Sequence, residues 1–196
     1  EEQDLPPESR EYVSALEHQA EKLRFLIDAL VKTSRLESGV LAMTPKRHGI
    51  QQLLDAASAQ AAPGAEAKAI TLTVEPTDLT ARFDPKWTAE ALYNLVDNAV
   101  KYTPAGGAVT LRAVGYELFC RVDVTDTGPG IPESEQARIF QRFYRSPSAS
   151  EAEGVGIGLY LARQIAAGQG GYLKVSSRPG EGSTFSLFLP RAEERT

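Results

Sequence analysis

The apolar pattern of the first 40 residues most limits what this 196-residue chain can fold into. From Val13 to Ser34, apolar or small side chains recur at alternating spacings of three and four, the narrow seam of a coiled coil or helical bundle. Gly39 supplies a helix stop and Pro45 prevents resumption, so the pattern predicts one long helix over 8–38. Such a helix is about 45 Å long. It cannot bury its apolar face alone, so we expect partner helices from a second copy or from sequence not present here.

Beyond Pro45 the pattern changes to short segments of mixed helical and strand-like spacing. We predict helices over 49–60, 85–102 and 159–168, a loop over 62–67, and strands over 70–74, 109–114, 118–124, 172–176 and 184–189. The simplest partition is a helical stalk over 1–44, an α/β domain over 45–190 and a short tail over 191–196.

Charge and composition exclude several classes of protein. The net charge of −5 disfavours a non-specific nucleic-acid binder, because that mode needs a basic surface. No run approaches the roughly 20 apolar residues that span a bilayer, and the acidic start is not a signal peptide. The single cysteine, Cys120, has no partner for an internal disulfide and argues against a structural zinc site. We therefore expect a soluble cytoplasmic protein with no nucleic-acid partner.

The predicted helix over 85–102 has an unusual polar stripe. Asn94, Asn98 and Lys101 lie on one arc with Glu90 and Asp97, while the apolar residues occupy another arc. A solvated helix face is the alternative, but such a face favours Glu and Lys over Asn, a mediocre helix former. Two asparagines one turn apart, followed by a lysine, form a row that suits hydrated Mg²⁺ and the phosphates it bridges.

Two glycine-rich runs follow this helix. Asp126 opens the sequence Asp-Thr-Gly-Pro-Gly, where glycines allow close backbone approach and an acceptor-only carboxylate can select the amino group of adenine. An ordinary Asp-Gly turn is the alternative. The second run, 154–159, lacks both the preceding strand of a Rossmann turn and the Gly-Lys-Ser/Thr ending of a P-loop. It opens a helix and offers N–H groups to phosphate.

Between the two runs lies 139–145, Ile-Phe-Gln-Arg-Phe-Tyr-Arg. We interpret its aromatic residues as core packing rather than as a stacking surface for a ligand. Arg142 and Arg145 either neutralise phosphate or are simply solvated.

The order of these elements resembles the ATP-binding domain of sensor histidine kinases, within the wider GHKL family that includes gyrase, Hsp90 and MutL. The matching segments are the N box at 94–102, the first glycine box at 126–130, the F box at 140–144, the second glycine box at 154–159 and a closing motif at 182–185. The resemblance implies an α+β fold, a two-layer α/β sandwich (the Bergerat fold). A long helix precedes it, and helices cover one face of its mixed sheet. ATP would lie between the Asn-rich helix and a lid over roughly 145–154.

The resemblance also assigns roles to single residues. Asn98 would ligate Mg²⁺, and Asn94 and Lys101 would hold phosphate oxygens, with Arg142 completing the catalytic set. Asp126 would accept from adenine. The full ATP-binding set it implies is Asn94, Asn98, Lys101, Tyr102, Asp126, Gly128, Gly130, Ile131, Arg142, Gly154, Val155, Gly156, Ile157, Gly158, Leu159 and Thr184, of which Tyr102 and Thr184 would lie near the nucleobase.

The function implied is that of a histidine protein kinase that passes phosphate from ATP to a histidine and then to a response regulator. The stalk resembles the second helix of the kinase dimerisation domain, and the first helix, which carries the acceptor histidine, is absent. His18 and His48 lack the acceptor context. We therefore expect a fragment of a membrane-bound parent that binds Mg-ATP and does not phosphorylate itself.

The expected partners are a dimerisation domain that carries the acceptor histidine, a response regulator, and a second copy that pairs through 8–38. A gyrase-type ATPase and a nucleotide-binding interaction module without catalysis are the alternatives. ATP-hydrolysing relatives carry Glu where Asn94 stands, and an amide cannot accept the proton of an attacking water.

Overall fold

The computed structural model describes residues 6–37, 43–146 and 155–191, and the chain divides into two units, Glu1–Val40 and Leu41–Thr196. The first unit contains helix α1 (Pro7–Glu37), as the apolar pattern predicts. Large apolar side chains of its seam are exposed, with Leu16 at 68% and Leu23 at 57%. No helix among the described residues is long and apolar enough to cross a bilayer.

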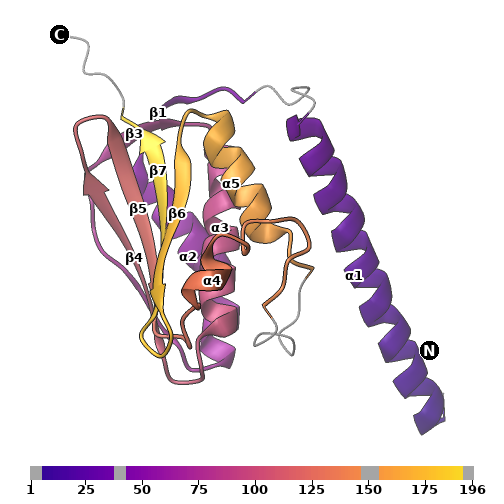
Figure 1. The fold of residues 1–196 in the computed structure, drawn as a ribbon. Helices are drawn as coiled ribbons and strands as arrows, with labels where there is room; N and C mark the ends of the chain where they lie inside the picture. The colour runs from indigo at the N-terminus through magenta and orange to yellow at the C-terminus, as the bar shows by residue number, and fades with distance from the viewer. Residues whose placement is uncertain (1–5, 38–42, 147–154, 192–196) are drawn as a thin grey trace. The chain divides into compact units, whose positions relative to one another are not determined.

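The second unit is built on a five-stranded mixed sheet of order β2-β4-β5-β7-β6. Its strands are β2 (Thr71–Val74), β4 (Ala108–Gly115), β5 (Phe119–Asp126), β6 (Tyr172–Arg178) and β7 (Gly182–Pro190). Strand β2 runs parallel to β4, and the other neighbours are antiparallel. Helices α2 (Ile50–Ala67), α3 (Pro85–Tyr102) and α5 (Gly158–Gly168) cover one face of this sheet (Figure 1). The expected α+β sandwich is confirmed.

Three short elements are additional to the expected ones. Strands β1 (Lys46–Gly49) and β3 (Thr80–Phe83) form an antiparallel pair, and α4 (Glu133–Gln136) is a single turn. Neither Lys46–Gly49 nor Glu133–Gln136 has an apolar alternation that would mark it in the sequence, and Thr80–Phe83 has only two apolar residues.

Helix α2 continues through 62–67, where we expected a loop, so that prediction is wrong. Pro63 lies inside the helix, while Ala61 and Ala65 on either side are buried and extend its apolar stripe. A Cβ on Gly64 would lie 3.5 Å from Val100 Cγ1, which places the backbone of α2 close to α3. Packing against α3 therefore outweighs the low helix propensity of proline and glycine.

Asp84 and Pro85 begin α3 as the sequence predicts. Asp84 Oδ1 accepts hydrogen bonds from the backbone N–H groups of Lys86 at 3.1 Å and Trp87 at 3.2 Å. The other oxygen, Oδ2, accepts from Thr44 N at 3.0 Å. One carboxylate therefore caps α3 and holds the segment that leads into the domain.

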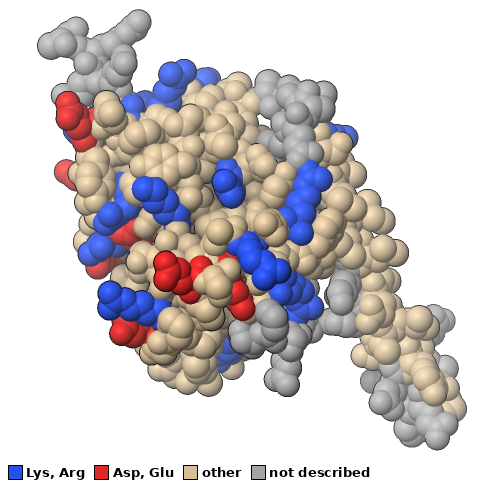
Figure 2. Space-filling view, in the orientation of Figure 1, with Lys and Arg blue, Asp and Glu red and all other residues tan. Residues whose placement is uncertain are grey.

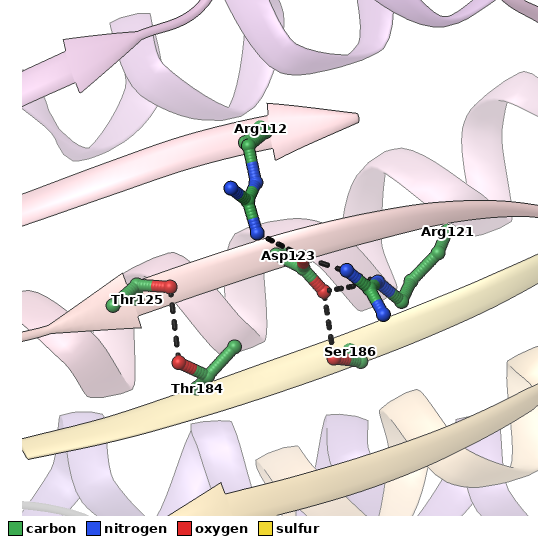
Figure 3. A network of polar contacts seen from close by, with 6 residues as sticks. All are labelled: Arg112, Arg121, Asp123, Thr125, Thr184 and Ser186. Atoms are coloured by element: carbon green, nitrogen blue, oxygen red, sulfur yellow. Dashed lines mark hydrogen bonds and ion pairs between the residues drawn. The ribbon is translucent and has the colours of Figure 1, made fainter. Parts of the chain in front are cut away.

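The opposite face of the sheet carries a polar network around Asp123, whose side chain is only 2% exposed (Figure 3). Arg112 and Arg121 form ion pairs with it at 3.3 and 3.0 Å, and Ser186 Oγ donates to it at 2.7 Å. Alternate residues of a strand point to opposite faces of the sheet. The network therefore shows which residues of β5 and β7 point away from the helices.

Candidate functional site

The polar stripe of α3 meets the first turn of α5. Asn94 Nδ2 donates to Glu90 O at 3.0 Å, and this bond fixes the orientation of the amide. A Cβ built on Gly158 would lie 3.0 Å from Asn94 Oδ1, so the amide oxygen faces the glycine that begins α5. Asn98 lies half-buried one turn further along α3. The structure thus brings the Asn-rich helix and the second glycine run together.

Further along α3, three polar side chains are close to one another. Lys101 Nζ lies 5.3 Å from the centre of the Tyr102 ring. Burial raises the pKa of Asp97, an effect that the Lys101 ammonium and the Tyr93 hydroxyl oppose. Burial likewise raises the pKa of the Tyr102 phenol. Lys101 and Tyr102 are half-buried while Asp97 is exposed, so only part of this end of the stripe is withdrawn from water, and electrostatic interactions are stronger in that part.

Asp126 is the last residue of β5 and is only 6% exposed. Burial raises the pKa of its carboxyl group, and hydrogen bonds from the backbone N–H groups of Gly128 and Ser183 oppose this rise. The bond from Gly128 N to Oδ1 measures 2.8 Å. A buried carboxylate that receives only main-chain donors is suited to recognise a ligand that brings a donor of its own.

The loop after Asp126 packs too closely for side chains. A Cβ on Gly128 would lie 2.7 Å from Asp126 Oδ1 and 3.3 Å from the carbonyl oxygen of Tyr102. Gly130 has φ +73°, and a Cβ there would collide with the carbonyl of Arg178. Ile131 N donates to Ser177 Oγ at 2.8 Å, which attaches the loop to β6. The first glycine run thus lies against both the end of α3 and the sheet.

The second glycine run is joined to the aromatic segment. Phe143 N donates to Gly156 O at 2.9 Å, and a Cβ on Gly156 would lie 2.6 Å from the carbonyl oxygen of Tyr144. Phe140 is buried, as we expected for a core aromatic residue. Phe143 is 50% exposed and has φ +60°, so that expectation is wrong for this residue. The hydrogen bond to Gly156, and not burial of the ring, accounts for the backbone conformation of Phe143.

The Arg142 side chain contacts Tyr160 in the first turn of α5. Its Nη2 donates to Tyr160 Oη at 3.0 Å, and its guanidinium lies 4.8 Å from the centre of the Tyr160 ring. Figure 2 shows Lys and Arg side chains over the part of the surface formed by α5 and residues 137–146, with acidic side chains beside them at α4. The sequence of this region supplies Arg138, Arg142, Arg145 and Arg163. In a chain with a net charge of −5, this local excess of cations suits an anionic ligand.

The structure places Thr184 on the other face of the sheet from Asp126. Thr184 Oγ1 lies 3.1 Å from Thr125 Oγ1, on the face that carries Asp123 (Figure 3). Ser183 is paired with Asp126 in the strand register and is 6% exposed. Ser183 is therefore the residue that shares a face with Asp126, and the expected position of Thr184 is corrected by one residue. Strand alternation through Phe185, Leu187 and Leu189, which are buried, was the signal that could have identified it.

The remaining expected residues divide into two groups. Val155 and Leu159 are half-buried and Ile157 is 3% exposed, all at the beginning of α5. Gly154 and most of the expected lid over 145–154 lie outside the described residues. The structure therefore joins α3, the Asp126 loop and the second glycine run from Val155 onward.

The residues present fit Mg²⁺ held mainly by water and phosphate. Within the described ranges, no group of three His, Cys, Asp or Glu side chains could form an all-protein metal site. The amide oxygens of Asn94 and Asn98 are hard oxygen donors of the kind that Mg²⁺ prefers, and Mg²⁺ usually keeps several waters and substrate oxygens.

Comparison with known proteins agrees with this geometry. Residues 83–193 match the family described as histidine kinase-, DNA gyrase B- and HSP90-like ATPase. The circadian input-output histidine kinase CikA of Synechococcus elongatus is 33% identical over 95% of this chain and 26% of its own length. The structure of full-length ShkA in complex with AMPPNP has a TM-score of 0.82 and 29% identity, over 98% of this chain and 41% of ShkA. The mycobacterial sensor histidine kinase MprB, covered completely, has a TM-score of 0.67 and 25% identity over 77% of this chain.

The chain therefore belongs to the histidine kinase-, gyrase B- and HSP90-like ATPase family, and its relatives within that family are sensor histidine kinases. It spans about a quarter of the length of CikA, so it corresponds to one part of such a protein.

Proposed function

We propose that this chain binds ATP with Mg²⁺ and supplies the catalytic half of a histidine autophosphorylation reaction. The single observation that carries the proposal is the buried Asp126 carboxylate, held by Gly128 N at 2.8 Å beside the end of α3. Adenine offers an amino donor at the position where guanine has a carbonyl oxygen. A buried anion there accepts from the first and repels the second.

Phosphoryl transfer is mostly a matter of positioning the γ-phosphate and neutralising its charge. Asn94, Asn98 and Lys101 lie along α3 at helical spacing, and Asn94 faces the N-terminus of α5. We assign Asn98 to Mg²⁺, and Asn94 and Lys101 to phosphate oxygens. The metal supplies charge neutralisation when it is bound. Arg142 would add positive charge after leaving Tyr160, and the N–H groups of the first turn of α5 suit phosphate.

The nucleophile would be the neutral imidazole of a histidine on a dimerisation domain. Asn94 supports this assignment, because an amide cannot act as the general base that a rapid ATPase requires at this position. From that histidine, phosphate would pass to a response-regulator aspartate, with the parent protein in a membrane and this part in the cytoplasm.

The exposed seam of α1 supports a second copy, or another helix of a dimerisation domain, as its partner. Leu16, Leu23 and Ile27 are all more than half exposed at coiled-coil spacing. A solvated apolar stripe of this length is unfavourable, and pairing would remove it from water.

A mixing assay tests the proposed reaction. The chain is incubated with radiolabelled Mg-ATP and a separately made dimerisation domain that carries the acceptor histidine. We expect acid-labile phosphate on that domain and none on the chain itself.

Two controls separate the alternatives. A dimerisation domain with the acceptor histidine replaced by Gln should remain unlabelled. Rapid phosphate release without any acceptor would instead indicate a gyrase-type ATPase. A chain that binds no adenine nucleotide in calorimetry would contradict the proposal altogether.

A further inference from the structure

The C-terminal end of α3 is held by a cation from outside the helix. Lys68, the residue that follows α2, donates from Nζ to the carbonyl oxygens of Val100 at 2.8 Å, Lys101 at 2.8 Å and Thr103 at 2.6 Å. The last carbonyls of an α-helix have no acceptor role inside the helix. An ammonium has three N–H donors, and here three carbonyl oxygens receive them.

The backbone of Lys68 is attached to the same region. Its carbonyl oxygen accepts from Gly106 N at 3.0 Å, in the loop that follows α3. On the other side, the carbonyl of Tyr102 lies against Gly128, where a Cβ would approach it to 3.3 Å. The end of α3 is therefore fixed between Lys68 and the loop that carries Asp126.

We infer that Lys68 is a positioning residue for ATP, acting through the last turn of α3. This inference rests on the proposed function, because that turn carries Lys101 and Tyr102. With its three donors occupied by main-chain oxygens, the ammonium of Lys68 sets where the turn ends relative to Asp126. It does not contact the nucleotide itself.

The chemistry of the side chain explains why a lysine serves here. Its compact ammonium presents three donors from one atom, whereas the guanidinium of arginine is a planar fork. A positive charge at a helix C-terminus also interacts favourably with the helix dipole. Arginine at this position would keep the charge but would lose part of the three-way geometry.

The test compares ATP affinity and local backbone protection in two matched variants. Lys68→Met removes the ammonium and keeps an aliphatic stem, and we expect ATP to bind about tenfold more weakly in calorimetry. Amide hydrogen exchange of residues 99–103 should become faster in the nucleotide-free protein. Lys86→Met removes a lysine from the exposed N-terminal end of the same helix, and both measurements should remain at their wild-type values. The ATP affinity and the amide exchange rates of Lys68→Arg should lie between those of wild type and Lys68→Met. If Lys68→Met does not fold, Lys68→Arg is the variant that tests the inference.

A double variant separates positioning from a general loss of stability. In a Tyr102→Ala background, the effect of Lys68→Met on ATP affinity should shrink to within about twofold, because part of what Lys68 positions is gone. An equal effect in both backgrounds, or unchanged ATP affinity in Lys68→Met, overturns the inference while leaving the proposed function intact. Absence of ATP binding by the wild-type chain overturns both, whatever the hydrogen exchange shows.

Discussion

Two buried aspartates lie near opposite ends of α3, and their surroundings differ. Asp84 is 8% exposed and receives four hydrogen bonds, from Thr44 N, Thr44 Oγ1, Lys86 N and Trp87 N. Burial raises the pKa of its carboxyl group, but these donors outweigh burial and the net pKa is lowered. Asp126 is 6% exposed, and the N–H groups of Gly128 and Ser183 only partly offset burial, so its pKa is raised.

The difference shows that burial alone does not distinguish a structural aspartate from a ligand-binding one. Asp84 is satisfied within the chain, and its charge stabilises the fold. Asp126 keeps a charge that the fold itself only partly compensates, which is expected of a group whose main partner is a ligand. The positions of the two residues agree with these two roles. Asp84 caps the N-terminus of α3, and Asp126 lies beside the C-terminus of α3, which carries Tyr102.

The largest expected effect comes from Asp126→Asn. The amide keeps the shape and can still accept from Gly128 N, but it would lose the charge-assisted bond that we propose Asp126 makes to adenine. We expect ATP affinity to fall by at least about 100-fold in isothermal titration calorimetry. Asp123→Asn is the matched control, because Asp123 is equally buried but lies on the other face of the sheet. Its ATP affinity should remain within about threefold of wild type, and unchanged affinity in Asp126→Asn would remove Asp126 from the site.

The next effect concerns stability and pH. Asp84→Ala should lower the free energy of unfolding by about 2–3 kcal/mol at pH 7, because it removes a helix cap and further acceptors. Because the folded pKa of Asp84 lies below the unfolded value of 3.8, the charge-dependent part of this difference should be constant above about pH 5 and be lost as the pH falls through the folded pKa.

Asp126→Asn should show the opposite sign of pH dependence. Its folded pKa lies above 3.8, so wild-type stability from this group is lost as the pH rises through that pKa. The nucleotide-free variant should therefore gain stability relative to wild type over this window. Urea unfolding from pH 3 to pH 8 measures the free energy of unfolding of each variant relative to wild type as a function of pH. If both differences change with pH in the same direction, the contrast between Asp84 and Asp126 is contradicted.

The smallest effect distinguishes two adjacent residues of β7. Ser183→Ala should weaken ATP binding by about threefold to tenfold, because it alters the face that carries Asp126. Thr184→Val should leave affinity within about twofold, since Thr184 points to Thr125 on the other face. If calorimetry shows a larger loss of ATP affinity in Thr184→Val than in Ser183→Ala, Thr184 rather than Ser183 is the residue on the ATP side of the sheet.

The sequence predicts most of the fold because its long elements have clear periods. The helix over 85–102 is recovered at its bounds, since Asp84 and Pro85 mark its start and its apolar arc is continuous. Strands β1 and β3 were missed because Lys46–Gly49 has no apolar alternation and Thr80–Phe83 has only two apolar residues. The end of α2 was misjudged because Pro63 and Gly64 indicate a loop locally, whereas contact with α3 is a tertiary effect.

The candidate site was predictable from motifs only in part. The motif order makes Asp126 and Asn94 candidates, but it does not say which residue of β7 lies on the same face of the sheet as Asp126. That choice depends on strand register, and the one-residue error at Thr184 moved the predicted contact to the wrong face of the sheet. The role of Lys68 has no motif at all, because a carbonyl cap is visible only when two distant segments meet.

The hydrogen bonds of Asp84 also have a mechanical consequence. Its carboxylate holds Thr44, where the chain enters the domain, and its N–H donates to Gln169 at the end of α5. Gln169 also bonds to Thr88 in the first turns of α3. Asp84 therefore connects the entering segment directly to the start of α3 and the end of α5, and the first residue of α5, Gly158, lies against Asn94 in the middle of α3.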